Sequence, residues 1–302
     1  MGSQSVTTSR GESLQGAACA MSAFLIWGLS PVLWKSIKTV PALETLMHRV
    51  VWSFLFLLPL VLFRNQWGEL KAALKSWKTL LILLSTTIFV STNWFVFIWA
   101  INNNHVLQTS LGYFINPLFN VLLGMVFLKE RLRPPQAVAV GMAFAAVLYL
   151  TLRLGEFPWV ALTLAFSFGF YGLIRKVAPV SALVGLSIET LLLCVPALGY
   201  LLYLDASGAG SFFRVSFKID LLLAATALVT ALPLLLFTLG ARQLHLSTLG
   251  FLQYIVPSCF FLFAVFVYHE PISTAQVWTF VMIWTALLIY STDSAIYYRK
   301  AG

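Results

Sequence analysis

Long apolar runs alternate with short polar segments along the whole chain. Residues 79–128 contain no Lys, Arg, Asp or Glu, and the segment Asn102-Asn103-Asn104-His105 forms a polar turn in their middle. Other charge-free runs occupy 13–34, 50–63, 134–152, 157–174, 221–241, 243–269 and 271–292. A helix needs about 20 apolar residues to span a bilayer. The pattern predicts ten membrane-spanning helices, at 14–35, 42–63, 78–101, 105–128, 134–152, 157–175, 182–203, 219–240, 245–268 and 273–296.

The two halves of the chain match at a constant offset of 140 positions. Pairs that match in this way are His105 and His245, Pro117 and Pro257, Glu130 and Glu270, and Gln136 and Gln276. Five helices per half is an odd number, so the second half has to enter the membrane from the opposite side. We therefore predict two inverted five-helix repeats, at 14–153 and 154–296, with tails at 1–13 and 297–302. This architecture is typical of transporters that alternate access around a midplane site.

Composition places the chain in the membrane class. Hydrophobic residues make up 60% of it and charged residues only 10%, whereas soluble domains carry about 25% charged residues. Because the apolar runs are continuous and do not alternate with polar positions, they exclude an outer-membrane barrel. The sequence predicts an all-α integral membrane protein.

The basic residues indicate topology. The net charge is +9, but Lys and Arg lie in short loops and not along one face, so we expect no nucleic-acid partner. If the N-terminus is cytoplasmic, the inner side carries 13 Lys and Arg residues and the outer side five. The positive-inside rule then predicts that both termini are cytoplasmic and that the chain spans a bacterial inner (plasma) membrane.

Several segments resemble a known family. They are Trp27-Gly28-Leu29-Ser30-Pro31, Trp34-Lys35, Glu44, His48-Arg49, Trp52-Ser53, Asn93-Trp94, Trp99-Ala100, Ser110-Leu111-Gly112-Tyr113-Phe114-Ile115-Asn116-Pro117-Leu118 and Lys129-Glu130-Arg131-Leu132. They are similar to RarD-type permeases of the EamA / drug-metabolite transporter superfamily. The likeness runs from about residue 14 to 297, and the second half supports only the broader family. The resemblance implies an inner-membrane permease for a small organic metabolite or an amphipathic drug, with chloramphenicol-type efflux as one form.

Two charged residues lie inside predicted helices and are candidates for substrate binding or gating. Arg49 lies seven residues into its helix, and its match at the 140 offset is Glu189. Ionisable side chains within a membrane usually face a cavity or a partner. We expect Arg49 and Glu189 to line the transport cavity, as a charge pair that opens during transport. A permanent structural ion pair is the equally weighted alternative. His48 is either a proton relay or a hydrogen-bonded packing residue.

A second set of candidates consists of polar and aromatic residues well inside apolar spans. Some of them flank glycine and proline, which loosen a helix and free backbone carbonyls. A mainly apolar cavity with a few polar groups suits a lipophilic or aromatic substrate, although interhelical hydrogen bonding is the more common role for each residue taken singly. These candidates are Asn93, Trp94, Tyr113, Asn116, Gln253 and Tyr254.

Charged residues near the ends of the predicted helices are not expected to bind substrate in the membrane interior. Lys35 and Glu44 lie at the predicted outer side, where they could gate an entrance. Glu130 and Glu270 lie at membrane edges and are interpreted as neutralising nearby basic residues and a helix start. The histidines and cysteines have no metal-ligand spacing, so no metal and no cofactor is expected.

A transporter is the function that these observations favour. The expected partners are a small-molecule substrate and the lipid bilayer. Proton coupling and facilitated diffusion both stay open, and a monomer suffices although a dimer is not excluded. The alternative from another class is a polytopic membrane enzyme acting on a lipid-linked substrate. Such an enzyme would need acid, base or metal ligands at one membrane face, and the sequence shows no phosphate loop or carboxylate cluster.

Overall fold

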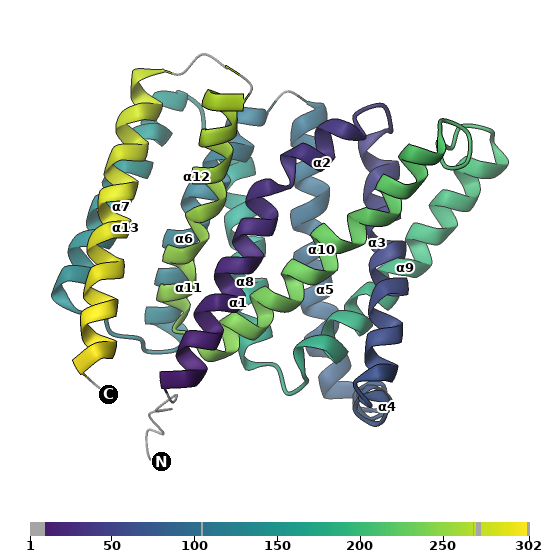
Figure 1. The fold of residues 1–302 in the computed structure, drawn as a ribbon, viewed down its shortest axis with the longest axis horizontal. Helices are drawn as coiled ribbons and strands as arrows, with labels where there is room; N and C mark the ends of the chain where they lie inside the picture. Colours follow the sequence, from purple (N-terminus) through teal and green to yellow (C-terminus); the bar gives the residue numbers. More distant parts are fainter. Residues whose placement is uncertain (1–9, 104, 268, 270–272, 301–302) are drawn as a thin grey trace.

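The computed structural model describes residues 10–103, 105–267, 269 and 273–300, and the part it describes is helical without strands. Figure 1 shows a bundle of long helices. The elements are α1 (Arg10–Leu29), α2 (Pro31–Ser36), α3 (Ala42–Phe63), α4 (Trp67–Lys75), α5 (Trp77–Asn102), α6 (Val106–Phe127), α7 (Pro134–Leu154), α8 (Trp159–Val177), α9 (Ala182–Ala206), α10 (Phe217–Gln243), α11 (Leu246–Gln253), α12 (Ile255–Leu262), the π-helical turn η1 (Phe263–Val267) and α13 (Thr274–Lys300).

Ten segments of the described chain are long and apolar enough to cross a membrane, which confirms the predicted number. The first is α1 together with α2, and the ninth runs from Leu246 to Val267 through α11, α12 and η1. The start of α1 and the end of α13 lie at one end of the bundle, and α2 lies at the other end (Figure 1). We call these the terminal end and the α2 end.

The first predicted helix is broken where serine precedes proline. A proline has no N–H to donate and favours the first turn of a helix, so α2 starts anew at Pro31. Ser30 bridges the break: its Oγ donates to the Trp27 carbonyl at 2.7 Å and accepts from Trp34 Nε1 at 3.0 Å. The break therefore fixes the direction of the Trp34 side chain.

The ninth predicted helix is also interrupted, at Tyr254 between α11 and α12. Before the break, α11 packs closely on α6. The approach is so close that a β-carbon at Gly250 would lie 2.5 Å from the Pro117 carbonyl oxygen. Only glycine permits this approach. It places Gln253, at the end of α11, beside the polar side chains of α6.

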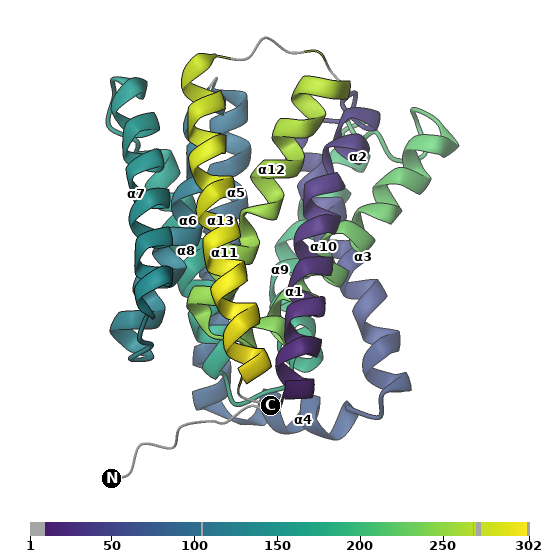
Figure 2. The same ribbon diagram turned by 60° about the vertical axis from the view of Figure 1, so that its left-hand side comes forward.

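The helix α4 was not predicted, because the sequence indicated a loop over 64–77. It lies across the terminal end of the bundle (Figure 2). Its buried residues, Leu70 and Ala73, belong to an apolar cluster with residues of α3, α5 and α9. A two-residue apolar face on nine residues is too short to signal a helix without its packing partners.

Helices of the two halves pair across the bundle. Four pairs begin 140 residues apart: Ala42 and Ala182, Trp77 and Phe217, Val106 and Leu246, and Pro134 and Thr274. Three of these pairs pack directly, namely α3 on α9, α6 on α11 and α7 on α13. The α7–α13 pair and the α3–α9 pair lie at opposite sides of the bundle (Figure 1). The inverted orientation of the halves and the cytoplasmic placement of the termini stay predictions.

Candidate functional site

A cavity of about 620 Å³ lies between the two lateral helix pairs. This volume falls in the range of about 300–1,000 Å³ that small-molecule sites occupy. The cavity extends from the bundle interior to the loop before α3, at the α2 end. Its lining comes from both halves and includes Trp27, Trp34, Lys38, Arg49, Asn93, Trp94, Phe97, Tyr113, Asn116, Phe168, Thr230, Gln253 and Phe260.

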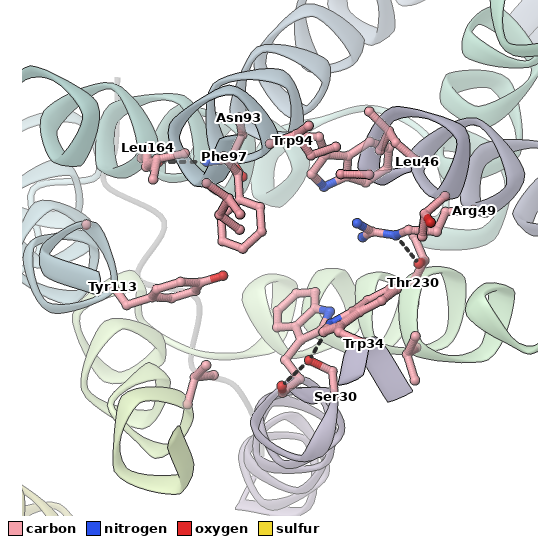
Figure 3. Close-up of a pocket in the computed structure, with 18 of the residues that line it drawn as sticks. Ser30, Trp34, Leu46, Arg49, Asn93, Trp94, Phe97, Tyr113, Leu164 and Thr230 are labelled. Atoms are coloured by element: carbon pink, nitrogen blue, oxygen red, sulfur yellow. Dashed lines mark hydrogen bonds between the residues drawn. The ribbon is translucent and has the colours of Figure 1, made fainter. Parts of the chain in front are cut away.

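Arg49 is the polar centre of one wall. Its Nε donates to Thr230 Oγ1 on α10 at 3.0 Å. Its guanidinium carbon lies 4.9 Å from the ring centroid of Trp34 and 5.2 Å from that of Trp94, which are cation–π distances. The guanidinium tip points into the cavity, toward the hydroxyl of Tyr113 (Figure 3). Two tryptophans and a threonine thus orient the arginine while its end groups face open space.

The opposite wall is aromatic, and its rings pack against one another. Tyr113 meets Phe97 and Phe260 edge to face, at ring-centroid distances of 6.3 Å and 5.5 Å. Asn93 Nδ2 donates to the Leu164 carbonyl at 2.9 Å and to Ser167 Oγ at 3.1 Å, so Asn93 joins α5 to α8 beside the cavity. This amide is mostly used in holding helices together.

An amide cluster lies at the α6–α11 contact. Asn120 Nδ2 donates to Asn116 Oδ1 at 3.1 Å and to Gln253 Oε1 at 2.9 Å. Asn116 and Gln253 line the cavity, whereas Asn120 is fully buried behind them. Because both cavity-lining amides use their oxygens toward Asn120, their nitrogen donors are left for a molecule in the cavity. Asn116 and Gln253 were predicted from the sequence, but Asn120, one helical turn beyond Asn116, was not.

Six of the predicted binding or gating residues therefore line one cavity: Arg49, Asn93, Trp94, Tyr113, Asn116 and Gln253. Sequence reasoning missed Trp34, Phe97 and Thr230. Trp34 lies near the end of the predicted helix 14–35, a position at which tryptophan is common as an anchor at the membrane interface. The serine–proline pair just before it was the signal that the helix breaks there.

The expected charge pair between Arg49 and Glu189 is wrong. Glu189 is buried outside the cavity lining, and its cationic partner is Arg175, with Nε 3.5 Å from Glu189 Oε1. Its carboxylate also accepts from Thr86 Oγ1 at 2.5 Å and from Tyr171 Oη at 3.3 Å. The two side chains point away from each other into different surroundings: Glu189 contacts residues of α5 and α8. Arg49 contacts residues of α2, α5 and α10 that line the cavity. Arg175, the last residue of the predicted helix 157–175, is completely buried.

Other predicted residues lie beside the cavity without lining it. Tyr254 is buried and donates to the Phe114 carbonyl at 3.2 Å. Glu44 is buried, not exposed at an entrance: it accepts from Ser211 N at 2.6 Å and from Ser211 Oγ at 2.9 Å. His48 Nε2 lies 3.9 Å from Glu44 Oε1.

The basic residue at the α2 end of the cavity differs from the predicted one. Lys38 lines the cavity there, whereas Lys35 is exposed outside its lining. The two lie only three residues apart, so helix periodicity alone could not choose between them.

At the terminal end, basic side chains bind backbone carbonyls across helices. Lys176 Nζ donates to the carbonyls of Ala241 and Leu244, and Arg242 donates to those of Ala178 and Val180. These bonds tie the end of α8 to the end of α10. The described lining of the cavity does not reach this end.

Glu130 caps a helix at the same end, which corrects its interpretation as a neutraliser of neighbouring charges. Its carboxylate accepts from Leu246 N at 2.6 Å and from Ser247 N at 2.9 Å, the free donors at the start of α11. Burial alone would raise the pKa of Glu130, but hydrogen bonds from His245, Ser247 and Leu246 outweigh it and lower the pKa to about 2. Glu270, its match in the repeat, lies outside the described residues.

The described residues hold no group of three or more His, Cys, Asp or Glu that could bind a metal ion. Among the described lining residues, the titratable side chains are Lys38, Arg49 and Tyr113. The arrangement can bind and orient a small molecule through stacking, one guanidinium and a few amide or hydroxyl donors.

Comparisons with known proteins place the chain in a family. Residues 14–152 match the EamA-like transporter family. Protein RarD of Salmonella typhi is 46% identical over 286 residues, which cover 95% of this chain and 97% of the relative. An uncharacterized transporter of Vibrio cholerae serotype O1 is 45% identical, with 98% and 97% covered. The Chloramphenicol-sensitive protein RarD of Pseudomonas aeruginosa is 35% identical, with 95% and 96% covered.

One solved crystal structure shares the architecture, with a TM-score of 0.72 and 17% identity over 93% of this chain and 97% of that one. At this identity the likeness concerns the fold alone. The relatives span nearly the whole chain and match the RarD resemblance of its motifs. With ten apolar helices around a cavity that draws on both halves, the chain belongs to the EamA-like transporter family as a RarD-type permease.

Proposed function

We propose that this membrane transporter moves a small organic molecule by alternating access, with the molecule bound in the cavity around Arg49. The observation that carries the proposal is the cavity itself. It is lined from both halves, and among the described residues it reaches the α2 end and not the terminal end. It centres on one arginine held between two tryptophans. An aromatic, mostly apolar enclosure with a few polar groups is typical of small-molecule sites.

The contrast between the two ends supports alternating access. The cavity reaches the loop at the α2 end, whereas Lys176 and Arg242 tie helix ends together at the terminal end. With the termini in the cytoplasm, as the loop charges predict, this state is open to the outside and closed to the cytoplasm. The opposite state requires that the carbonyl bonds at the terminal end break and that α2 and the loop after it close over the cavity.

The repeat supplies a reason for two such states. The equal 140-residue offsets of four helix starts support an inverted repeat, and exchanging the conformations of two inverted halves exchanges the open and closed ends. In this proposal the α3–α9, α6–α11 and α7–α13 contacts act as the surfaces about which the halves move.

The test is flux in proteoliposomes combined with side-specific blocking. A panel of aromatic acids, amines, amides and chloramphenicol would be offered to a variant that carries Ile98→Cys, with Cys19, Cys194 and Cys259 replaced by Ala. Ile98 lines the cavity, so we expect saturable flux of at least one compound and its block by a membrane-impermeant thiol reagent. The matched control is Ser207→Cys, an exposed position outside the cavity, where the reagent should leave flux intact.

The proposal fails if no compound moves, or if the reagent blocks both variants equally. It also fails if saturating substrate does not slow the modification of Ile98→Cys, because a molecule in the cavity has to shield that position.

A further inference from the structure

We infer that the cavity takes a small organic anion, with its carboxylate on Arg49 and a flat apolar body against the facing aromatic wall. The inference rests on the proposed function and names its substrate class. Three observations support it: the positive charge of the cavity, the terminal guanidinium nitrogens of Arg49 that face open space, and the aromatic walls.

The cavity is positively charged without internal compensation. Its charged residues among those described are Lys38 and Arg49, and no described lining residue is Asp or Glu. The nearby buried carboxylates are already engaged, Glu44 with Ser211, Asp220 with Phe213 N and Glu189 with Arg175. An arginine inside a membrane stays charged and is costly without a partner. An anionic substrate would supply the missing partner.

The guanidinium is held so that its end remains available. Nε is bonded to Thr230, and the ring faces of Trp34 and Trp94 flank the group. The two terminal nitrogens donate to no described residue and point into the cavity (Figure 3). Two parallel N–H donors match the two oxygens of a carboxylate, which is the strongest form of this contact. A lysine in the same place would offer a point charge instead.

The residues of the cavity wall that face Arg49 determine which body the carboxylate can carry. Figure 3 shows Tyr113 across the space from Arg49, with Phe97 on the same side as Trp94. The tyrosine hydroxyl points toward the guanidinium, where it can donate to a second carboxylate lone pair. Asn116 and Gln253 add amide N–H donors. These donors lie in the same cavity as the guanidinium, which favours an anion over an amine, and the rings favour a planar body.

The test uses matched probes on the purified full-length chain in detergent. Phenylacetate, 3-phenylpropionate and indole-3-acetate would each be compared with the corresponding neutral amide and with the corresponding amine. Because Trp34 and Trp94 line the cavity, binding of the phenyl probes can be followed by tryptophan fluorescence, and that of the indole probes by protection against unfolding. We expect at least one acid to bind tenfold or more tightly than its amide and its amine.

Variants then assign the preference to Arg49. Arg49→Gln should remove the advantage of the acid over the amide while the amide still binds, and Arg49→Lys should restore part of it. Arg153→Gln is the matched control, because Arg153 is exposed outside the cavity and contacts Tyr149. It should leave the acid-to-amide ratio unchanged.

Three outcomes would overturn the inference: no probe triplet in which the acid binds best, an amine that binds best, or an unchanged acid-to-amide ratio in Arg49→Gln. Each differs from failure of the proposed function. A protein that transports neutral or cationic compounds through the cavity would refute the anion and keep the transporter, whereas absence of flux for every compound would refute the transporter.

Discussion

Arg49 and Glu189 occupy matching places in the two halves and have opposite surroundings. Each lies seven residues beyond the first residue of its helix, α3 or α9. Each is hydrogen-bonded to a threonine on a long helix of the other half, Arg49 to Thr230 on α10 and Glu189 to Thr86 on α5. Arg49 lines an open cavity and has no described acidic partner, whereas Glu189 is buried against Arg175. Similar positions in a repeat therefore do not imply similar roles.

The difference follows the two ends of the bundle. Glu189 is buried between packed helices. Toward the terminal end, Lys176 and Arg242 bind backbone carbonyls that connect α8 to α10. At the 140 offset Lys176 and Arg242 correspond to Ser36 and Asn102, so the sequence provides these cations in one half only. We expect Glu189 to contribute to stability and Arg49 to binding, and the following experiments separate the two.

The largest effect is expected at the buried pair. Glu189→Ala leaves the fully buried Arg175 without its counter-charge, which should lower the free energy of unfolding by about 3–5 kcal/mol. Thermal unfolding in detergent measures this loss. Arg49→Ala should cost much less, because it separates no ion pair. Replacing both members of the pair, as Arg175→Met with Glu189→Leu, should recover most of the stability. If Glu189→Ala and Arg49→Ala lower the free energy of unfolding equally, the assignment of Glu189 to stability and Arg49 to binding is wrong.

The second effect concerns binding. In Arg49→Gln we expect flux of the preferred anion to fall by about 30-fold or more, in line with the roughly 2–5 kcal/mol lost when one member of a buried charge pair is truncated. The midpoint of thermal unfolding should stay within a few degrees of the wild type. Proteoliposome flux and thermal unfolding on the same preparation test both statements. A variant that loses stability in parallel with flux would assign Arg49 to structure.

A smaller effect should appear at the terminal end. Lys176→Met removes charge-assisted hydrogen bonds to two carbonyls, each worth about 1.5–3 kcal/mol. The closed terminal end should open more often, so modification of Ile98→Cys by a thiol reagent added from outside should slow. Lys129→Met, a basic residue at the same end, is the comparison variant. Unchanged labelling in Lys176→Met would show that these bonds do not hold the end closed.

The smallest effect is the cap on α11. Glu130→Gln should cost about 0.5–2 kcal/mol at neutral pH, as is usual for loss of an N-terminal cap. Because the pKa of Glu130 is lowered from 4.5 to about 2, its contribution is complete above pH 4.5 and declines as pH falls toward 2. The stability difference between wild type and variant should therefore shrink across that window. A difference independent of pH would show that the charge of Glu130 is not what stabilises the helix.

Local hydrophobicity explains what could be predicted. Each of the ten apolar runs satisfies its own backbone hydrogen bonds as a helix, so the number and rough limits of the spans follow from the runs alone. Arg49, Asn93, Tyr113 and Asn116 were identifiable as unusual because polar groups are costly in those runs. Composition alone did not reveal α4, whose two buried residues gain their meaning from the helices beneath them.

By itself, the sequence determined the membrane class and the ten spans, and it singled out Arg49 as a central candidate. Only the tertiary structure decided that Glu189 pairs with Arg175, that Trp34 and Trp94 hold Arg49, and that Glu130 caps α11. The physical reason is that a span is a property of one segment and its solvent. The partner of a side chain depends on how each helix is rotated about its axis and where it breaks, and both are settled by packing between residues far apart in the chain.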